Sequence, residues 1–213
     1  MKKLLFGALA LFVTAAMAQN NDSEVTISSS NSNSVNVLQA GADNTSEVTV
    51  SNASNLNSIG LGQLGEGNDS EIEVENNSSR NTITALQDGD GNEIEMDAWR
   101  GIKDNSDLNV VAIMQDGDDN EVAVEIDENS NLNAISVYQE GDGNESDVDV
   151  DDESSRNLIR VRQFEEGNES DVEIDDDSDA NFVRVRQRGE DNDSDDEIMM
   201  IQIEMSLKSD KEG

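Results

Sequence analysis

The sequence contains no cysteine, no proline and no histidine among its 213 residues. Without cysteine and histidine the chain has no disulfide, no Ser-His-Asp triad and no zinc cluster. Carboxylates are spread evenly by the repeat, and segment 88–92, which resembles the start of an EF-hand loop, lacks the glycine and the final glutamate of that loop. We therefore expect no enzyme activity, no catalytic residue, no cofactor and no metal site, although weak calcium binding to the acidic positions stays open.

Aromatic and basic residues are scarce as well. Aromatic residues make up 3% of the chain, and 13 basic residues stand against 49 acidic ones, a net charge of −36. This charge argues against nucleic acid as a partner, because phosphate binding requires the opposite sign. Low hydrophobicity with high net charge is typical of disordered chains, so a disordered acidic buffer for ions is one alternative.

Segment 1–18 differs from the rest of the chain. Two lysines precede an apolar run, and a small-x-small motif ends the segment before a cleavage point between Ala18 and Gln19. The run is too short to span a membrane, and no other transmembrane segment is expected. Residues 1–18 are thus predicted to be a secretory signal peptide, and the mature chain keeps 11 basic and 49 acidic residues.

Seven glutamines recur along the chain, with successive spacings of 24, 24, 28, 24, 24 and 24. An asparagine stands six positions before each glutamine, another stands five positions after it, and a glycine follows by two in six of the seven units. A fixed period of this length is typical of repeat architectures, and such order argues against disorder. The positions expected to form amide ladders and turns are Asn33, Gln39, Gly41, Asn44, Asn57, Gln63, Gly65, Asn68, Asn81, Gln87, Gly89, Asn92, Asn109, Gln115, Gly117, Asn120, Asn133, Gln139, Gly141, Asn144, Asn157, Gln163, Asn168, Asn181, Gln187, Gly189 and Asn192, with Glu165 in place of one glycine.

Each unit predicts two short strands with one buried face each. Along 33–39 an asparagine, two aliphatic residues and the glutamine share one parity, and strand side chains alternate between faces. Along 44–50 an asparagine, a serine and two valines do the same. Gly41 supplies the turn between them, because glycine adopts positive φ without steric cost. The second-strand pattern at 21–27 predicts that the array begins with a half-unit in segment 19–32.

A strand with a single apolar face needs neighbours, and stacked repeats supply them. The sequence therefore predicts an all-β fold, a β-solenoid of about seven 24-residue repeats over 33–198, with rungs about 4.8 Å apart and a core about 34 Å long. Valine and isoleucine fill its interior, and buried Asn and Gln amides stack in register, each bonded to the copies above and below, as in cross-β ladders. A terminal strand or tail at 199–213 follows.

The one longer interval carries four extra residues near 98–104. Insertions in solenoids map to loops, so we expect an inter-repeat loop there. Trp99 lies in this loop and either caps it or contacts a partner.

The unit Asn-x5-Gln-x-Gly-x-x-Asn resembles the curlin repeat, across seven units over 33–198. The second glycine of that repeat is present at Gly67, Gly91, Gly143 and Gly167, whereas Asn replaces its opening Ser and an aliphatic residue replaces its second Gln. The resemblance implies a secreted subunit, either major or nucleating, of curli-like amyloid fibres on the cell surface. It also implies export through a curli-type outer-membrane channel, a related fibre subunit as partner, and a role in adhesion and biofilm formation.

Both ends of an uncapped solenoid expose unpaired backbone groups, and this chain has no proline to protect them. Each end is therefore a template for a second copy. The outward positions of the second strands are acidic, so stacking places like charges about 4.8 Å apart. We expect low pH, salt or divalent cations to accelerate assembly; alternatively, the acids only maintain solubility in a salty habitat.

Six of the 11 mature basic residues lie within 156–188. Arg160 and Arg184 fall in one outward column, and Arg162 and Arg186 in another. They attract the acidic strand of a neighbouring subunit, attract an anionic cell surface, or neutralise nearby acids; the sequence leaves all three open. For the whole chain, the alternative to a fibre subunit is a monomeric acidic β-solenoid that binds a surface, for example through calcium.

Overall fold

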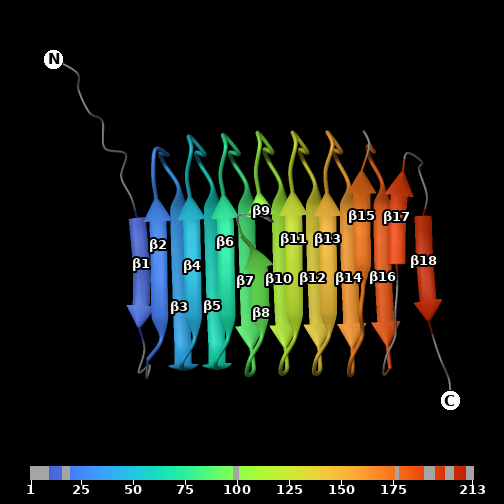
Figure 1. The fold of residues 1–213 in the computed structure, drawn as a ribbon, viewed down its shortest axis with the longest axis horizontal. Helices are drawn as coiled ribbons and strands as arrows, with labels where there is room; N and C mark the ends of the chain where they lie inside the picture. The colour runs from blue at the N-terminus through green and yellow to red at the C-terminus, as the bar shows by residue number, and fades with distance from the viewer. Residues whose placement is uncertain are drawn as a thin grey trace.

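The computed structural model describes residues 10–15, 20–97, 101–175, 178–189, 195–199 and 204–209. Within these residues the protein is all-β, and its parallel strands stack into a β-solenoid of about seven turns, with one sequence repeat to each turn (Figure 1). The fold class predicted from the repeat is confirmed. The described part of the chain holds no helix long and apolar enough to cross a membrane.

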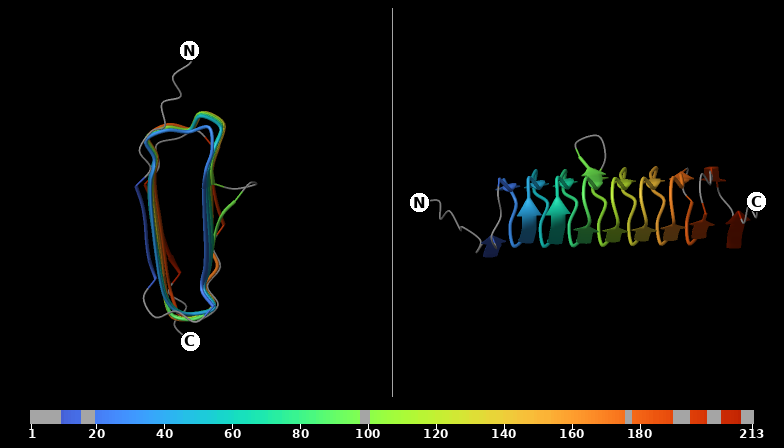
Figure 2. Two further views of the ribbon diagram at one scale, coloured as in Figure 1. Left: turned by 90° about the vertical axis from the view of Figure 1, so that its left-hand side faces the viewer. Right: turned by 90° about the horizontal axis from the view of Figure 1, so that it is seen from below.

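Two parallel sheets form the long sides of the solenoid. Seen down the long axis, successive rungs superpose as one flattened loop (Figure 2, left). The first sheet runs in the order β1 (Ala10–Ala15), β3 (Ser34–Ala42), β5 (Ser58–Glu66), β7 (Thr82–Asp88), β10 (Val110–Asp116), β12 (Ala134–Glu140), β14 (Leu158–Phe164), β16 (Phe182–Arg188) and β18 (Glu204–Ser209). The second sheet runs in the order β2 (Asp22–Ile27), β4 (Thr45–Val50), β6 (Asp69–Val74), β8 (Glu93–Met96) with β9 (Gly101–Ile102), β11 (Glu121–Ile126), β13 (Glu145–Val150), β15 (Asp171–Asp175) and β17 (Asp195–Met199).

Every neighbouring pair of strands is parallel and in register with the sequence repeat. Val35 lies opposite Ile59, and Gln39 lies opposite Gln63. Since strands of the first sheet pair one repeat apart from β3 to β16, Gln39 and its successors form one column of glutamines, and Val35 and its successors form one column of valine and isoleucine. One sequence repeat therefore corresponds to one turn of the solenoid.

The core is a thin layer of aliphatic side chains between the two sheets. Strand β4 alternates exposed and buried positions, with Val48 and Val50 fully buried, and β3 does the same with Val35 and Val37. The valine and isoleucine positions predicted to face inward are therefore buried. Burial of a valine or isoleucine side chain contributes about 1.5–3 kcal/mol, which makes this layer the main stabilising element of each rung.

The two ends of each rung use left-handed backbone. In the arch that follows β4, Asn52, Ala53 and Leu56 have φ values of 53°, 67° and 61°. The equivalent arch after β6 repeats this with Asn76 and Asn77. Asn and Asp tolerate the left-handed region better than most residues, which explains why these arches are rich in them.

The four extra residues lie at a different place from the one expected. They do not lie in a loop between repeats but interrupt a strand of the second sheet, because Met96 pairs with Ile72 while Ile102 pairs with Val74 and Ile126. Both flanking side chains stay fully buried. The chain leaves and re-enters the strand without moving either core residue, and this keeps the hydrophobic column intact.

Gly101 makes the re-entry possible. Its φ is +106°, and a Cβ there would lie 2.7 Å from the carbonyl oxygens of both Glu73 and Met96. Only glycine fits such a position.

The terminal segments also contain strands. β2 pairs with β4 along its whole length, as the half-unit pattern predicts. β1 lies within the predicted signal peptide and pairs with β3. The cleavage point between Ala18 and Gln19, Trp99 and Asn192 lie outside the described residues.

Candidate functional site

The glutamine column forms a continuous ladder through the first sheet. The Nε2 group of Gln63 donates to Oε1 of Gln87 at 2.9 Å, and the same bond recurs from Gln39 to Gln187. The same Nε2 also lies 2.8 Å from the Thr45 carbonyl and 3.2 Å from the Asn68 carbonyl. Each glutamine therefore joins its own turn to both neighbouring rungs.

The asparagine column that begins at Asn44 forms a second ladder. Nδ2 of Asn68 donates to Oδ1 of Asn44 at 2.9 Å and to the carbonyl of Gly89 on the next rung at 2.8 Å. The backbone N–H of Asn68 also donates to Oδ1 of Asn44. This column therefore contacts the rung below and the rung above, as predicted for an amide ladder.

The column that begins at Asn33 bonds differently from the expected ladder. Its side-chain oxygens accept the backbone N–H of the next asparagine, as from Asn57 to Asn33 at 2.8 Å, and Nδ2 of Asn33 donates to the Ser54 carbonyl. At this corner the asparagine side chains bond to backbone groups, because the carbonyls of the arch point inward. The residues are buried as predicted, but they hold the arch rather than one another.

The turn glycines lie in close contact along the stack. Gly117 has φ +133°, and a Cβ there would lie 2.2 Å from the carbonyl oxygen of Gly141. The glycine carbonyls accept the Asn44-type Nδ2 groups, as from Asn120 to Gly141 at 2.7 Å. Glu165, which replaces glycine in one unit, keeps a left-handed φ of 76°, and its carbonyl accepts from Asn144 at 3.0 Å.

One column that the sequence analysis missed is a set of buried serines in the arches. The hydroxyl oxygen of Ser78 accepts the backbone N–H of Ser106 at 3.1 Å, and Ser106 accepts from Ser130 in the same way. The signal was present, because a serine stands three positions before each arch asparagine from Asn57 onward. The column comprises Ser54, Ser78, Ser106, Ser130, Ser154 and Ser178.

Two asparagines, one in the first described rung and one near the last, have side-chain atoms that lack partners. Within the described residues, both side-chain atoms of Asn181 and Nδ2 of Asn21 are buried and make no hydrogen bond. In the interior rungs the equivalent atoms are bonded to the neighbouring rung. A buried amide without a partner costs about 1–3 kcal/mol, so a donor or acceptor that reached either asparagine would stabilise the stack.

The outward side of the second sheet is acidic in every rung. Asp149 is the most perturbed group there: burial, followed by the charges of Glu125 and Asp151, raises its pKa to about 7. Burial and neighbouring carboxylates also raise the pKa of Glu71, Glu73 and related groups. Stacked like charges therefore oppose the fold at neutral pH, and protonation relieves them.

Lys103 is the exception in this acidic surface. It directly follows β9, and Asp127 takes the equivalent position after β11 in the next rung. The Nζ of Lys103 lies 2.7 Å from Glu125 and 3.7 Å from Asp127. Burial lowers its pKa, but the hydrogen bond and charge of Glu125 outweigh this, so the pKa of Lys103 is raised. It stays charged and neutralises the acids beside the insertion.

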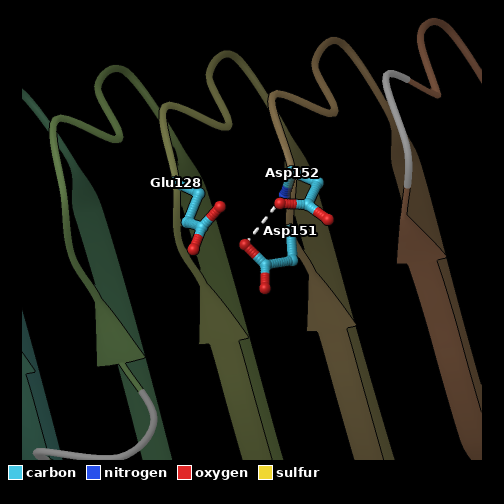
Figure 3. A group of neighbouring side chains, drawn as sticks. All are labelled: Glu128, Asp151 and Asp152. Carbon is cyan, nitrogen blue, oxygen red and sulfur yellow. Dashed lines mark hydrogen bonds between the residues drawn. The ribbon is translucent and has the colours of Figure 1, made fainter.

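Three carboxylates gather at the arch side of this sheet (Figure 3). Oxygens of Glu128, Asp151 and Asp152 lie within 4.8 Å of one another, and the Asp152 N–H donates to Oδ1 of Asp151 at 2.7 Å. A side-chain hydrogen bond with Asp152, and then the charges of Asp151 and Asp152, raise the pKa of Glu128 to about 7. Two of the three residues are exposed, so the cluster is a point of high negative charge on the surface.

Comparison with known protein families, curated proteins and solved structures finds no match to this chain.

Proposed function

We propose that this chain is a secreted structural subunit, major or nucleating, of curli-like functional amyloid fibres on the cell surface, where it acts in adhesion and biofilm matrix. Copies join end to end, and the final rung of one pairs with the first rung of the next. The fibre is a continuation of the solenoid itself. Export through a curli-type outer-membrane channel and a related fibre subunit belong to the same proposal.

The observation that carries this proposal is the open edge at both ends of the second sheet. In the described part of the chain, β2 pairs only with β4, and β17 pairs only with β15. Neither edge strand contains a proline or a bulge, which are the usual devices against edge pairing. The edges therefore match the ladder between them and favour a second copy in the same register.

The predicted signal peptide adds a control point to the proposal. β1 covers the edge of β3 in the full chain. Cleavage after Ala18 removes β1 and leaves β3 as a second open edge beside β2. The mature chain then presents β2 and β3 as open edges at this end, whereas in the precursor β1 takes the place of β3.

The test uses a proline at the open edge. Asp22 and Ser28 direct their N–H groups to β4. Because successive residues alternate, Ser23 directs its N–H away from the sheet. Ser23→Pro in mature chain 19–213 removes an edge donor and leaves the β2–β4 hydrogen bonds in place. Every end-to-end junction contains this edge, so we expect seeded thioflavin growth to stop while circular dichroism still reports a folded β protein.

Ser23→Ala is the matched control. The Ser46 hydroxyl donates to Ser23 at 2.9 Å, and both substitutions remove this bond, but only proline removes the backbone donor. The alanine variant should grow at the wild-type rate. Equal growth of the alanine and proline variants, or no fibres from the wild type, contradicts end-to-end assembly.

A second candidate is a monomeric acidic β-solenoid that binds a surface through calcium. The cluster of Glu128, Asp151 and Asp152 is the observation that favours it. A mature chain that stays monomeric in the seeding experiment and binds calcium stoichiometrically by calorimetry supports this candidate instead.

A further inference from the structure

The two outward faces of the solenoid carry opposite kinds of side chain. Outward positions within the strands of the second sheet, from β2 to β15, are acidic or neutral, and Lys103, just after β9, adds a basic residue to this face. Outward positions of the first sheet are uncharged from β3 to β12, apart from Glu66, Asp88, Asp116 and Glu140 at the strand ends, and then become basic on β14 and β16.

The basic part of the first sheet is a two-by-two block of arginines. Arg160 lies opposite Arg184, and Arg162 lies opposite Arg186, in adjacent strands. Arg162, Arg184 and Arg186 are exposed. Like charges directly opposite one another are destabilising in a sheet. The ion pairs of the described residues involve Lys103 and Arg156 and none of these four arginines.

Aromatic side chains adjoin the block. The Phe164 ring lies 5.8 Å from the Tyr138 ring, and the guanidinium groups of Arg186 and Arg188 lie 5.7 and 5.2 Å from the Phe164 ring centre. Phe164, Tyr138 and Arg162 also line a hollow of about 550 Å³ on this face. Arginine, tyrosine and phenylalanine in one patch are typical of protein–protein interfaces.

We propose that this arginine–aromatic block docks on the acidic outward face of the second sheet of another copy, side by side with it. The acidic face has the same two-by-two arrangement of side chains, because Asp147 and Asp149 lie opposite Asp171 and Glu173. Both blocks have rungs about 4.8 Å apart and residues two positions apart along the strand. Charges of opposite sign therefore match in two dimensions, which an anionic cell surface does not offer.

The net charge of the chain sets the conditions for this contact. Two mature copies, each with 11 basic and 49 acidic residues and so a net charge of −38, repel at long range, but at physiological salt charges more than about 8 Å apart are screened. Ion pairs in contact persist under these conditions. Side-by-side association should therefore rise from low salt to about 0.15 M and fall again near 1 M. The contact widens a fibre rather than lengthening it, and so goes beyond the end-to-end function proposed above.

The first experiment maps the contact with a charge-conserving variant. Arg162→Lys/Arg186→Lys keeps both positive charges and adds two amines, which a zero-length carbodiimide joins to touching carboxylates. In an equal mixture of ¹⁴N and ¹⁵N protein, we expect mixed-isotope links from positions 162 and 186 to acids of the second sheet, such as Asp147 or Asp171. Links confined to acids of the first sheet, or no mixed-isotope links, overturn the proposal.

The second experiment reverses the charge. Arg162→Glu/Arg186→Glu should reduce filaments to single width in electron micrographs, with unchanged circular dichroism. Arg80→Glu/Arg156→Glu makes the same change in net charge on exposed arch residues and should leave the width unaltered. Equal narrowing by both variants means that net charge alone sets the width and overturns the proposal. Single filaments that still elongate leave end-to-end assembly intact, so the two proposals fail separately.

Discussion

At the scale of single residues, the protein replaces a large hydrophobic core with satisfied amides. Gln115 lies fully buried, and its Nε2 donates to Gln139 at 3.1 Å and to the carbonyls of Glu93 and Asn120 at 2.9 and 2.8 Å. Its Oε1 accepts from Gln87. A buried polar side chain is tolerated because each of its bonds has a partner, and removal of one member leaves several groups unpaired.

Gln115→Leu therefore tests the ladder. The substitution keeps the volume but leaves the amide oxygen of Gln139 without its donor, at about 1–3 kcal/mol. It also removes the Gln115 bonds to the carbonyls of Glu93 and Asn120, although the Asn120 carbonyl keeps the Glu93 N–H as a donor. We expect the free energy of unfolding, measured in urea, to fall by about 3–5 kcal/mol in total. Asp116→Asn, at the exposed neighbouring position, should change it by less than about 0.5 kcal/mol. A tolerated leucine would mean that the ladder contributes little.

The turn glycines provide a matched pair. Gly117→Ala places a Cβ 2.2 Å from the Gly141 carbonyl, whereas Gly143→Ala meets nothing within 4 Å although its φ is +63°. The second substitution should cost about 1 kcal/mol for left-handed backbone alone. The first should cost several times more, because the rungs must separate. Equal losses in thermal melts would show that contact between the turns is unimportant.

Asp149 makes stability depend on pH. Its folded pKa of about 7 lies above the ordinary value of 3.8, so the folded state binds the proton more tightly than the unfolded chain. The resulting destabilisation is fully present above pH 7, recedes as pH falls through 7, and is absent below the unfolded pKa. Asp149→Asn should stabilise the protein by about 1–2 kcal/mol at pH 8 and have little effect near pH 4.

Glu47→Gln is the control for this measurement. It removes one charge from an exposed position of the same face. If it raises the pH 8 melting temperature as much as Asp149→Asn does, total charge rather than burial of one carboxyl sets the pH dependence.

For single residues, the sequence predicts burial but not every hydrogen-bond partner. The burial of Gln39 and Asn44 follows from parity, because a strand has only two faces. The different bonding of Asn33 depends on where the arch carbonyls point, and no side-chain period encodes that direction. The serine column was readable as a period but was missed, since serine is equally common in exposed turns.

At the scale of the elements, the broken strand β8–β9 shows why the insertion was misplaced. A loop accepts extra residues because nothing there needs to pair. The outward side of a strand accepts them too, provided that the flanking core residues keep their columns, as Met96 and Ile102 do. Sequence length alone does not distinguish these two sites.

Lys103 is the prediction that belongs to this element. Lys103→Met keeps the aliphatic stem in its buried position but removes the charge that faces Glu125 and Asp127. Since these acids then lose their counterion, we expect a loss of about 1–3 kcal/mol at pH 8 that shrinks as pH falls. A loss that is the same at pH 4 and pH 8 would show that packing, not charge, is responsible.

At the scale of the whole molecule, two forces oppose each other. The open edges of the second sheet favour the addition of rungs, while the acidic face resists it. The pKa values of Glu71, Glu73 and Asp149 are raised, so a fall in pH protonates these groups and weakens the repulsion on the acidic face before it affects edge pairing. We therefore expect pH and salt to set the balance between the two.

Fibre X-ray diffraction tests end-to-end stacking most directly. Mature chain 19–213 is assembled at about pH 5, and the fibres are aligned. Because the strands would lie across the fibre axis, the account predicts a meridional reflection at about 4.8 Å and an equatorial reflection at about 10 Å from the facing sheets. Fibres whose inter-strand reflection lies on the equator, or a protein that forms no fibres at any pH or salt concentration, would contradict it.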